Sequence, residues 1–398
     1  MLYRKILFFI KNLKKINFNL NKKKIIIFDG LSISDLKYTM ELYDYFILED
    51  RINRINIIYI NPLIIYYFIF YFFLIFKNYS IKVIYTIALI RSIKPNVVIT
   101  SIDNSINFFL CAKILSKKIY FLVVQNDSES AFKEMGYGIK NNIIYPKNYK
   151  KLFFIPNFIC FGQNEKDGAI KEGLKINTFY KYGSIRVANF FYHIKKNNIK
   201  LNKNLFDICF ISEERSNQNN LFNHNFIEQG AINVLKFTIK FAIQNNLKFI
   251  FANKYFQDTN EFKSEIDFYS SQLNKEELEF LITNINKKKD SYSSQLASLQ
   301  SLVSVGTQST MLYEKIGLNE KILSCNFSGF SLFDFPVTGI CSMNENNYDD
   351  FSARLKLILG SKSNEYFQAL DRNPKYVMEF DNKESVIQKT RKIVEKYL

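Results

Sequence analysis

Residues 303–318 read VSVGTQSTMLYEKIGL, and this stretch decides the fold that the sequence predicts. An apolar strand is predicted to end at Gly306, and small polar residues then lead into a helix that carries Glu314 one turn from its start. Free backbone N–H groups at such a helix start hold phosphate, and the glutamate could accept a hydrogen bond from ribose hydroxyls. An ordinary α/β helix needs the same small capping residues, so both interpretations stay open. The candidate nucleotide-binding residues of this stretch are Gly306, Thr307, Ser309, Thr310 and Glu314.

Short apolar runs alternate with helix-period segments on both sides of this stretch. Runs that are rich in β-branched residues and bounded by polar turns are typical of buried parallel strands, which helices connect. We therefore predict an α/β fold made of two Rossmann-like domains. The predicted strands span 25–29, 45–50, 56–60, 97–100, 119–124, 158–162, 207–212, 248–253, 301–306 and 321–325, and the predicted helices span 34–43, 79–94, 104–117, 224–245, 273–285, 291–299, 309–316, 348–359 and 385–398.

The length of 398 residues is typical of two domains and too long for one ordinary core. Residues 195–205 are polar and basic without apolar periodicity, and a new predicted strand follows them. We place the domain boundary in this segment. The prediction is a basic arm over 1–24, an N-terminal domain over 25–200 and a C-terminal domain over 201–398.

The net charge of the chain is +17, and all of the excess lies in the first half. Residues 1–200 carry 31 Lys and Arg against 13 Asp and Glu, whereas residues 201–398 carry 23 against 24. Such asymmetry indicates domains with different partners, the first of them facing phospholipid headgroups, a phosphorylated acceptor or nucleic acid. A lysine-rich composition spread over a solvated face would give the same counts.

Two N-terminal segments have the composition of membrane-surface elements. Residues 1–20 alternate apolar side chains with five cations, which predicts a basic amphipathic helix in the membrane interface or packed on the protein. Its apolar stretch is too short for a secretory signal, and no small-residue cleavage site follows. Residues 55–76 contain no charge and would be long enough to cross a bilayer. Because Asn61 and Pro62 divide them, we expect a strand and a Tyr/Phe-rich helix, buried or interfacial, ahead of a true span.

The scarcity of soft metal ligands limits the chemistry. Five scattered cysteines form no CxxC pair, and the two histidines, His193 and His224, stand in polar surroundings that predict surface positions for both. A zinc cage or a disulfide framework is not expected, and we predict no metal site. A general base near neutral pH is then to be sought among the carboxylates.

The predicted strand, the G-T-x-S-T turn and the helix with Tyr-Glu resemble the nucleotide-sugar site of GT-B glycosyltransferases and their relatives. The chain is similar in particular to bacterial surface-carbohydrate biosynthesis proteins, including capsule enzymes that transfer Kdo or sialic acid. One departure is VQNDSES at 124–130, where the family leads us to expect Gln-Asn-Gly and then a basic residue. The likeness runs in order through TSIDNS (100–105), FICFGQNE (158–165), YGSIR (182–186), DICFISEE (207–214), IFANK (250–254) and YEKIGLNEKILSC (313–325).

The resemblance implies two domains that face a cleft, with the donor nucleotide on the C-terminal domain and the acceptor on the N-terminal domain. It implies a glycosyltransferase that uses no metal or other cofactor and moves a sugar from a nucleotide sugar to a surface glycan of capsule or lipopolysaccharide type. The charge asymmetry agrees with a lipid-linked or polysaccharide acceptor at an anionic membrane, and so with peripheral attachment at the inner, cytoplasmic face. Nucleic acid is not an expected partner, since the aromatic residues lie mostly inside apolar runs.

The predicted site residues lie at the ends of predicted strands. Asp103 follows a strand directly, at the edge where open α/β sheets bind ligands, and we predict that it deprotonates the acceptor hydroxyl while Asn104 orients the sugar. A structural role in capping the next helix is the alternative. The reserve candidates for the base are Asp29, Glu49 and Asp50. The remaining predicted donor-binding residues are Glu213, Arg215 and Lys254, of which the lysine would neutralise the leaving phosphate.

Other functions stay open on this sequence. A polyol-phosphate transferase of the CDP-glycerol type and a nucleotide-sugar 2-epimerase share the expected fold, although an epimerase has no need of a basic, membrane-seeking half. A nucleic-acid-binding protein would explain the positive charge. A catalytically inactive scaffold of a glycan-assembly complex would carry every motif described above.

Overall fold

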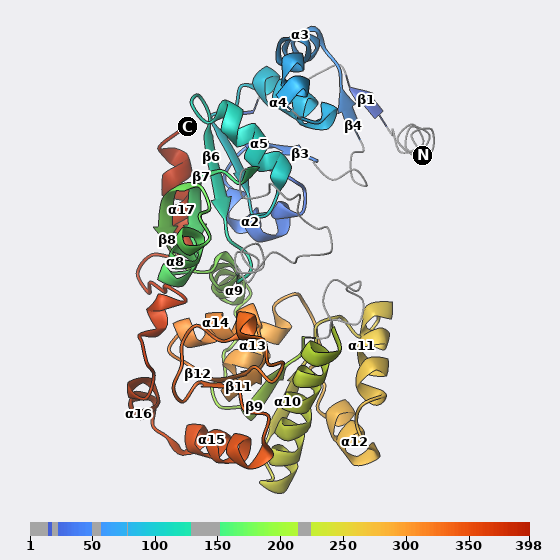
Figure 1. The fold of residues 1–398 in the computed structure, drawn as a ribbon, viewed down its shortest axis with the longest axis vertical. Helices are drawn as coiled ribbons and strands as arrows, with labels where there is room; N and C mark the ends of the chain where they lie inside the picture. Colours follow the sequence, from blue (N-terminus) through green and yellow to red (C-terminus); the bar gives the residue numbers. More distant parts are fainter. Residues whose placement is uncertain (1–14, 18–22, 50–56, 78, 129–151, 214–223) are drawn as a thin grey trace.

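The computed structural model describes residues 15–17, 23–49, 57–77, 79–128, 152–213 and 224–398. It contains two large parallel β-sheets, each covered by helices. Figure 1 shows the first sheet in the upper half of the view and the second in the lower half. This arrangement confirms the predicted α/β fold with two Rossmann-like domains.

The N-terminal sheet has six parallel strands in the order β3-β2-β5-β6-β7-β8. Every side chain of β2 and of β5 is buried, because helices cover both faces of the sheet. Alternate residues point to different faces, so Ile26 and Phe28 join one hydrophobic cluster while Ile25 and Ile27 join another. The strands are β2 (Ile25–Phe28), β3 (Tyr45–Leu48), β5 (Val97–Thr100), β6 (Tyr120–Val124), β7 (Ile155–Cys160) and β8 (Ile176–Lys181).

Helices on both faces complete this N-terminal unit. Helices α4 and α5 pack in the cluster around Phe28, whereas α2 and α9 pack in the cluster around Ile27. Helices α4, α5 and α9 each follow a serine whose hydroxyl accepts a hydrogen bond from a backbone N–H of the first turn. The helices are α2 (Ser32–Met40), α4 (Ile81–Ile93), α5 (Ile106–Leu115), α8 (Gln163–Lys171) and α9 (Ile185–Lys196).

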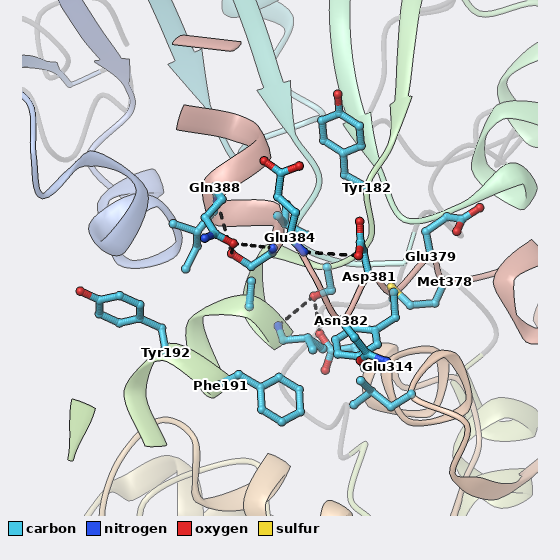
Figure 2. A pocket seen from close by; sticks show the side chains of 18 of the residues that line it. Tyr182, Phe191, Tyr192, Glu314, Met378, Glu379, Asp381, Asn382, Glu384 and Gln388 are labelled. Carbon is cyan, nitrogen blue, oxygen red and sulfur yellow. Dashed lines mark hydrogen bonds between the residues drawn. The ribbon is translucent and has the colours of Figure 1, made fainter. Parts of the chain in front are cut away.

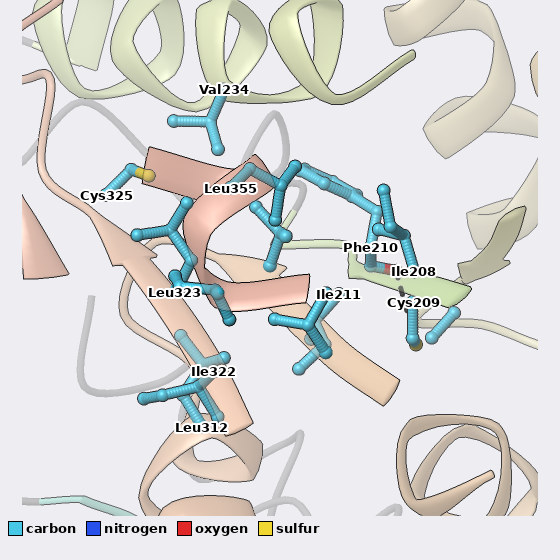
Figure 3. Close-up of a cluster of buried hydrophobic side chains, with 14 of the residues drawn as sticks. Ile208, Cys209, Phe210, Ile211, Val234, Leu312, Ile322, Leu323, Cys325 and Leu355 are labelled. Carbon is cyan, nitrogen blue, oxygen red and sulfur yellow. Dashed lines mark hydrogen bonds between the residues drawn. The ribbon is translucent and has the colours of Figure 1, made fainter. Parts of the chain in front are cut away.

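The C-terminal sheet has five parallel strands in the order β10-β9-β11-β12-β13. Figure 3 shows Val234 of α10 and Leu355 of α15 in one buried cluster with Ile208 of β9 and Leu323 of β12. The strands are β9 (Phe206–Ile211), β10 (Phe249–Ala252), β11 (Ser301–Gly306), β12 (Lys321–Cys325) and β13 (Ser342–Met343). The helices are α10 (His224–Gln244), α11 (Asn260–Ser270), α12 (Lys275–Thr283), α13 (Ser293–Leu299), α14 (Thr310–Gly317), α15 (Tyr348–Gly360) and α16 (Ser363–Gln368).

The last helix, α17 (Val386–Glu395), crosses back to the N-terminal sheet (Figure 1). It packs against α2 and α9, and its Val394 lies in the same cluster as Ile27. The segment before it passes so close to Gly183 that a Cβ there would lie 2.0 Å from the carbonyl oxygen of Glu379, and Gly183 has a φ of 94°. The predicted assignment of all of 201–398 to the second domain is therefore wrong for this helix.

Two predictions for the N-terminal segments need correction. The predicted strand at 56–60 appears as β4 (Ile57–Tyr59), but it pairs in parallel with β1 (Lys15–Asn17) and lies outside the main sheet. The strand at 15–17 also contradicts a continuous helix over 1–20; the rest of that arm, up to residue 22, lies outside the described residues. Across the described parts of the chain, no helix combines the length and the apolar character that crossing a bilayer requires.

Lys315 of α14 is buried at 1% exposure beneath β11. Its ammonium group donates to the carbonyl oxygens of Ser298 and Ser301 at 2.5 and 2.9 Å, and to the hydroxyls of Ser301 and Ser304 at 2.9 and 3.0 Å. These four acceptors are neutral, so nothing in this cage balances the charge. Burial lowers the pKa of Lys315 from 10.5 to about 7.

We expect the unfolding free energy of the protein to rise between pH 7 and about pH 10.5, because the unfolded chain then holds a proton that folded Lys315 has released. The rise should be on the order of a few kcal/mol. Urea titrations at the two ends of this range measure it. It should be absent from Lys315→Met and kept by Lys356→Met, an exposed lysine of α15. An unchanged rise in Lys315→Met would show that the folded state keeps the proton.

Candidate functional site

The start of α14 contacts the loop that follows β6. Strand β11 ends at Gly306, and the Ser309 side chain caps α14 by accepting from a backbone N–H of its first turn at 3.3 Å. The Thr310 hydroxyl accepts from the backbone N–H of Ser128 at 2.9 Å. The strand, turn and helix predicted for 303–318 are confirmed as local structure. They lie where the carboxyl ends of the two sheets approach each other.

Glu213, two residues past the end of β9, orders the same turn. Its carboxylate accepts from the Thr307 hydroxyl at 2.8 Å and from the backbone N–H of Gln308 at 3.2 Å. The predicted site residues Glu213 and Thr307 are therefore in direct contact, although 94 positions separate them. Arg215, predicted beside them, lies outside the described residues.

Glu314 joins the two domains. Its side chain is 4% exposed, and it accepts from the Ser184 hydroxyl of the N-terminal domain at 2.7 Å and from the side-chain amide of Gln295 at 3.1 Å. Burial raises the pKa of Glu314, and the nearby charge of Arg186 opposes this rise. Both carboxylate oxygens already accept from the protein, so the predicted ribose contact remains a prediction.

Arg186 is a site residue that sequence reasoning missed. It stands two residues past Ser184 at the start of α9, and its guanidinium lies 2.8 Å from the carboxylate of Asp127, in the loop after β6. Its partly buried position opposes its charge, yet the carboxylates of Glu314 and Asp127 raise the pKa of Arg186 above its ordinary value. The motif YGSIR at 182–186 contains this arginine. Strand β8, which precedes the motif, was not predicted, so nothing in the sequence indicated that Arg186 lies at a strand end.

A second cation lies close to Arg186 from the other domain. The ammonium group of Lys288 donates to the carbonyl oxygen of Lys254 at 2.9 Å. Burial lowers the pKa of Lys288, Glu265 opposes this shift, and repulsion by Arg186 adds to it. Lys254, the predicted partner of the leaving phosphate, is exposed after β10 and donates its backbone N–H to Glu265 at 3.1 Å. The two domains thus bring like charges together near the strand ends.

Asp103 is 5% exposed and lies just beyond β5. The helix that follows is capped by Ser105, whose hydroxyl accepts from the backbone N–H of Phe108 at 3.3 Å. Asn104 beside it is exposed. The neighbouring strand ends are tied together through Asp35, which accepts from Ser101 at 2.8 Å and from Asn126 at 3.2 Å.

The reserve carboxylates are placed differently. Asp29 is 2% exposed at the end of β2, has a φ of 75°, and accepts from the backbone N–H of Leu31 at 3.0 Å, as expected of a turn residue. Glu49 is half-buried after β3, and Asp50 lies outside the described residues. Among the described strand ends, Asp103 remains the first candidate for a base.

A cavity of about 970 Å³ lies on the side of α9 where the chain crosses between the domains (Figure 2). Tyr182, Phe191 and Gln388 line it together with the crossing segment. Glu314 reaches it, alone among the predicted site residues that the structure describes. The rest of the predicted site lies at the strand ends and does not open into this cavity.

His193 is not a surface residue, contrary to the prediction. Its ring nitrogen Nε2 lies 3.0 Å from the carboxylate of Asp290 in the other domain, and its side chain is 17% exposed. The side chain of His224 lies outside the described part of the structure. Within the described residues, no group of three or more His, Cys, Asp or Glu side chains could hold a metal ion.

Comparisons with known proteins show similarity in structure but not in sequence. No protein-family profile matches it, and no curated protein sequence is detectably similar. The UDP-GlcNAc 2-epimerase of Methanocaldococcus jannaschii, solved with UDP-GlcNAc and UDP, superimposes with a TM-score of 0.50 at 12% identity, covering 96% of this chain and 99% of that one. The UDP-GlcNAc 2-epimerase of Neisseria meningitidis gives a TM-score of 0.48 at 12% identity over 96% and 98% of the two chains. A variant of the wall teichoic acid polymerase TagF gives 0.48 at 11% identity over 99% and 97%.

At 12% identity the comparison supports a shared fold and not a shared function. The superposition on the Methanocaldococcus jannaschii enzyme covers nearly the whole of both chains, so it includes both sheets and the segments that join them. Two parallel sheets, helices on their faces and a last helix that returns to the first domain are all present in this chain. The chain therefore has the two-domain GT-B fold.

Proposed function

We propose that this protein is a glycosyltransferase that moves a sugar from a nucleotide-linked donor to a surface-glycan acceptor of capsule or lipopolysaccharide type. The observation that carries the proposal is the contact between the start of α14 and the N-terminal strand ends, through Ser128 and Thr310. In open α/β sheets ligands bind at the carboxyl ends of the strands, and here two such edges approach each other. A donor on one edge and an acceptor on the other would then be within reach of each other.

The donor is proposed to bind to the C-terminal domain. Backbone N–H groups at the start of α14 and the hydroxyls of Ser309 and Thr310 would hold phosphate, and Glu314 would accept from the ribose. Arg186 and Lys288, two cations that the fold brings together, would neutralise the charge that develops on the leaving diphosphate, with Lys254 beside them. In this proposal the side chains, and not a metal ion, stabilise the leaving group.

The acceptor is proposed to bind to the N-terminal domain, where Asp103 would take the proton of the attacking hydroxyl and Asn104 would orient the sugar. The positive charge of this half would bring the protein to the inner face of an anionic membrane, where a lipid-linked acceptor is concentrated. A nucleotide-sugar 2-epimerase acts on a soluble substrate and would gain nothing from such a surface. A polyol-phosphate transferase would benefit equally from a positively charged surface. The product of such an enzyme would carry the glycerol phosphate of the donor.

We expect nucleotides to raise the melting temperature of the purified protein. A screen of CMP, UDP, GDP, TDP and CDP-glycerol should give one base a shift of roughly 5 °C at saturating concentration, because a ligand that binds only the folded state stabilises it. Arg186→Gln should weaken binding of the preferred diphosphate about tenfold, since it removes one charge-assisted contact.

The matched control for this screen is Arg372→Gln. Arg372 is 45% exposed against 41% for Arg186, and it also pairs with an aspartate, but it lies on the far C-terminal segment. It should keep the full nucleotide shift. Equal losses in the two variants, or no shift with any nucleotide, would contradict the proposed donor site.

A further inference from the structure

Helix α3 (Pro62–Tyr71) lies at the outer end of the N-terminal domain (Figure 1) and continues into the 3₁₀ helix η2 (Phe72–Lys77). Both expose apolar side chains. Large side chains on them are strongly exposed, from 46% for Phe72 to 87% for Phe76. We call the exposed surface of these two helices the α3–η2 face. The residues on which the argument depends are Ile65, Ile69, Phe70, Phe72, Phe73 and Phe76. A contiguous apolar patch of this kind on a folded domain marks an interaction site.

The α3–η2 face is held in place by the fold. Asn61 caps α3 by accepting from the backbone N–H of Ile64 at 2.9 Å, and Pro62 fills the first turn. Ile64 and Leu74 are 3% and 2% exposed and lie in the cluster that includes α4. Two anchored residues on the inner side thus keep the aromatic side chains pointing outward.

The stretch of sequence that contains this face carries charges of one sign. Residues 51–100 contain six Lys and Arg and no Asp or Glu. Of these cations, Lys77 lies at the end of η2 itself, with its ammonium group 5.7 Å from the ring centre of Phe73. Against a second copy of this chain, a symmetric contact would bring these cations together without a balancing carboxylate. An anionic lipid surface balances them and also accepts the apolar side chains.

We propose that the α3–η2 face inserts into the headgroup boundary of an anionic bilayer. Helix α3 has ten residues and is about 15 Å long, half of the roughly 30 Å of a hydrocarbon core, so it lies in the interface and does not cross. Tyr and Phe side chains suit this boundary, and Lys77 can reach the phosphates beside them. This inference deepens the proposed function by naming the surface that contacts the membrane. It rests on the proposed function only for the claim that this membrane holds the acceptor.

A tryptophan reporter tests the insertion directly, because the chain contains no Trp. Phe70→Trp puts the only indole on the α3–η2 face, and Leu357→Trp puts it at a 60% exposed position of α15. With vesicles of equal parts phosphatidylcholine and phosphatidylglycerol, the emission of Phe70→Trp should move to shorter wavelength, and that of Leu357→Trp should not. A shift in neither variant, or in both, would overturn the proposal.

Flotation with the same vesicles gives the affinity. Ile69→Asp and Phe76→Asp should each weaken binding on the order of tenfold, whereas Leu357→Asp should not. Raising the salt concentration or using pure phosphatidylcholine should weaken binding of the wild type. Unchanged flotation of both variants, or equal binding to the neutral vesicles, contradicts the proposal.

Two further measurements separate the alternatives. Light scattering without lipid should give a monomer; a dimer that Ile69→Asp dissociates would assign the face to a second copy instead. The melting temperature of Ile69→Asp without ligand should stay close to that of the wild type, which shows that the variant is folded. Loss of flotation with this melting temperature intact supports the inference. Loss of both would mean that the variant fails to fold, in which case Phe76→Asp decides.

Discussion

Asp103→Asn is expected to lower turnover by about 10²- to 10⁴-fold while the affinity for the donor nucleotide stays at the wild-type value. The reason is that an amide cannot take the proton of the acceptor hydroxyl, whereas Asp103 is not among the proposed nucleotide contacts. The substitution keeps the size of the side chain, and Ser105 continues to cap α5. Initial rates with the nucleotide sugar found by the thermal screen, together with nucleotide titrations, measure both quantities.

Asp29→Asn is the matched control for this prediction. Asp29 is also a buried carboxylate at the end of a strand, 2% exposed against 5% for Asp103, but it holds a turn. Its variant should keep turnover within a few fold of the wild type. If Asp103→Asn does the same, neither Asp103 nor Asp29 is the base, and the base must be sought at Glu49 or Asp50.

Glu314→Ala is expected to weaken binding of the donor nucleotide by about 5- to 150-fold, the cost of one lost hydrogen bond from the ribose. It should also lower the unfolding free energy by about 2–4 kcal/mol, because it leaves Gln295 without its carboxylate acceptor and removes the tie to Ser184. Isothermal titration and urea unfolding measure the two effects separately.

Ser184→Ala distinguishes a nucleotide contact from a structural one. It removes the same bond between the domains, at 2.7 Å, and leaves the carboxylate of Glu314 available. We expect lower stability but a nucleotide affinity within a few fold of the wild type. An affinity loss as large as that of Glu314→Ala would make Glu314 a positioning residue. No affinity loss in either variant would place the donor elsewhere.

Most of the strands that the sequence predicted correctly are buried on both faces. IIIF at 25–28 and VVIT at 97–100 are continuous apolar runs because helices cover both sides of them. Strand β8 carries the mixed sequence INTFYK and lies at the sheet edge, where half-exposed side chains hide the pattern. Helix α11 was missed because polar residues dominate it. The predicted helices begin within a few residues of the observed ones where a Ser or Asn caps the first turn, as at α5 and α15.

The site was harder to predict than the fold, because its contacts join distant parts of the chain. The turn before α14 could be predicted, since its residues are adjacent in sequence. Ser184, the partner of Glu314, is 130 positions away in the sequence. Arg186 can be recognised as a site residue only from its interactions with Asp127 and Lys288, which the sequence does not reveal. Nothing local in the sequence distinguishes this arginine from the other cations of a basic half.

The return of α17 to the first domain sets the order in which the molecule can be assembled. Val386, Ile387 and Val394 complete the hydrophobic cluster that begins with Ile25 and Ile27. During synthesis the N-terminal sheet leaves the ribosome long before these residues exist, so one of its faces stays partly uncovered until α17 has been made. Chaperones would therefore meet an incompletely covered sheet, and losing α17 would damage the domain that is made first.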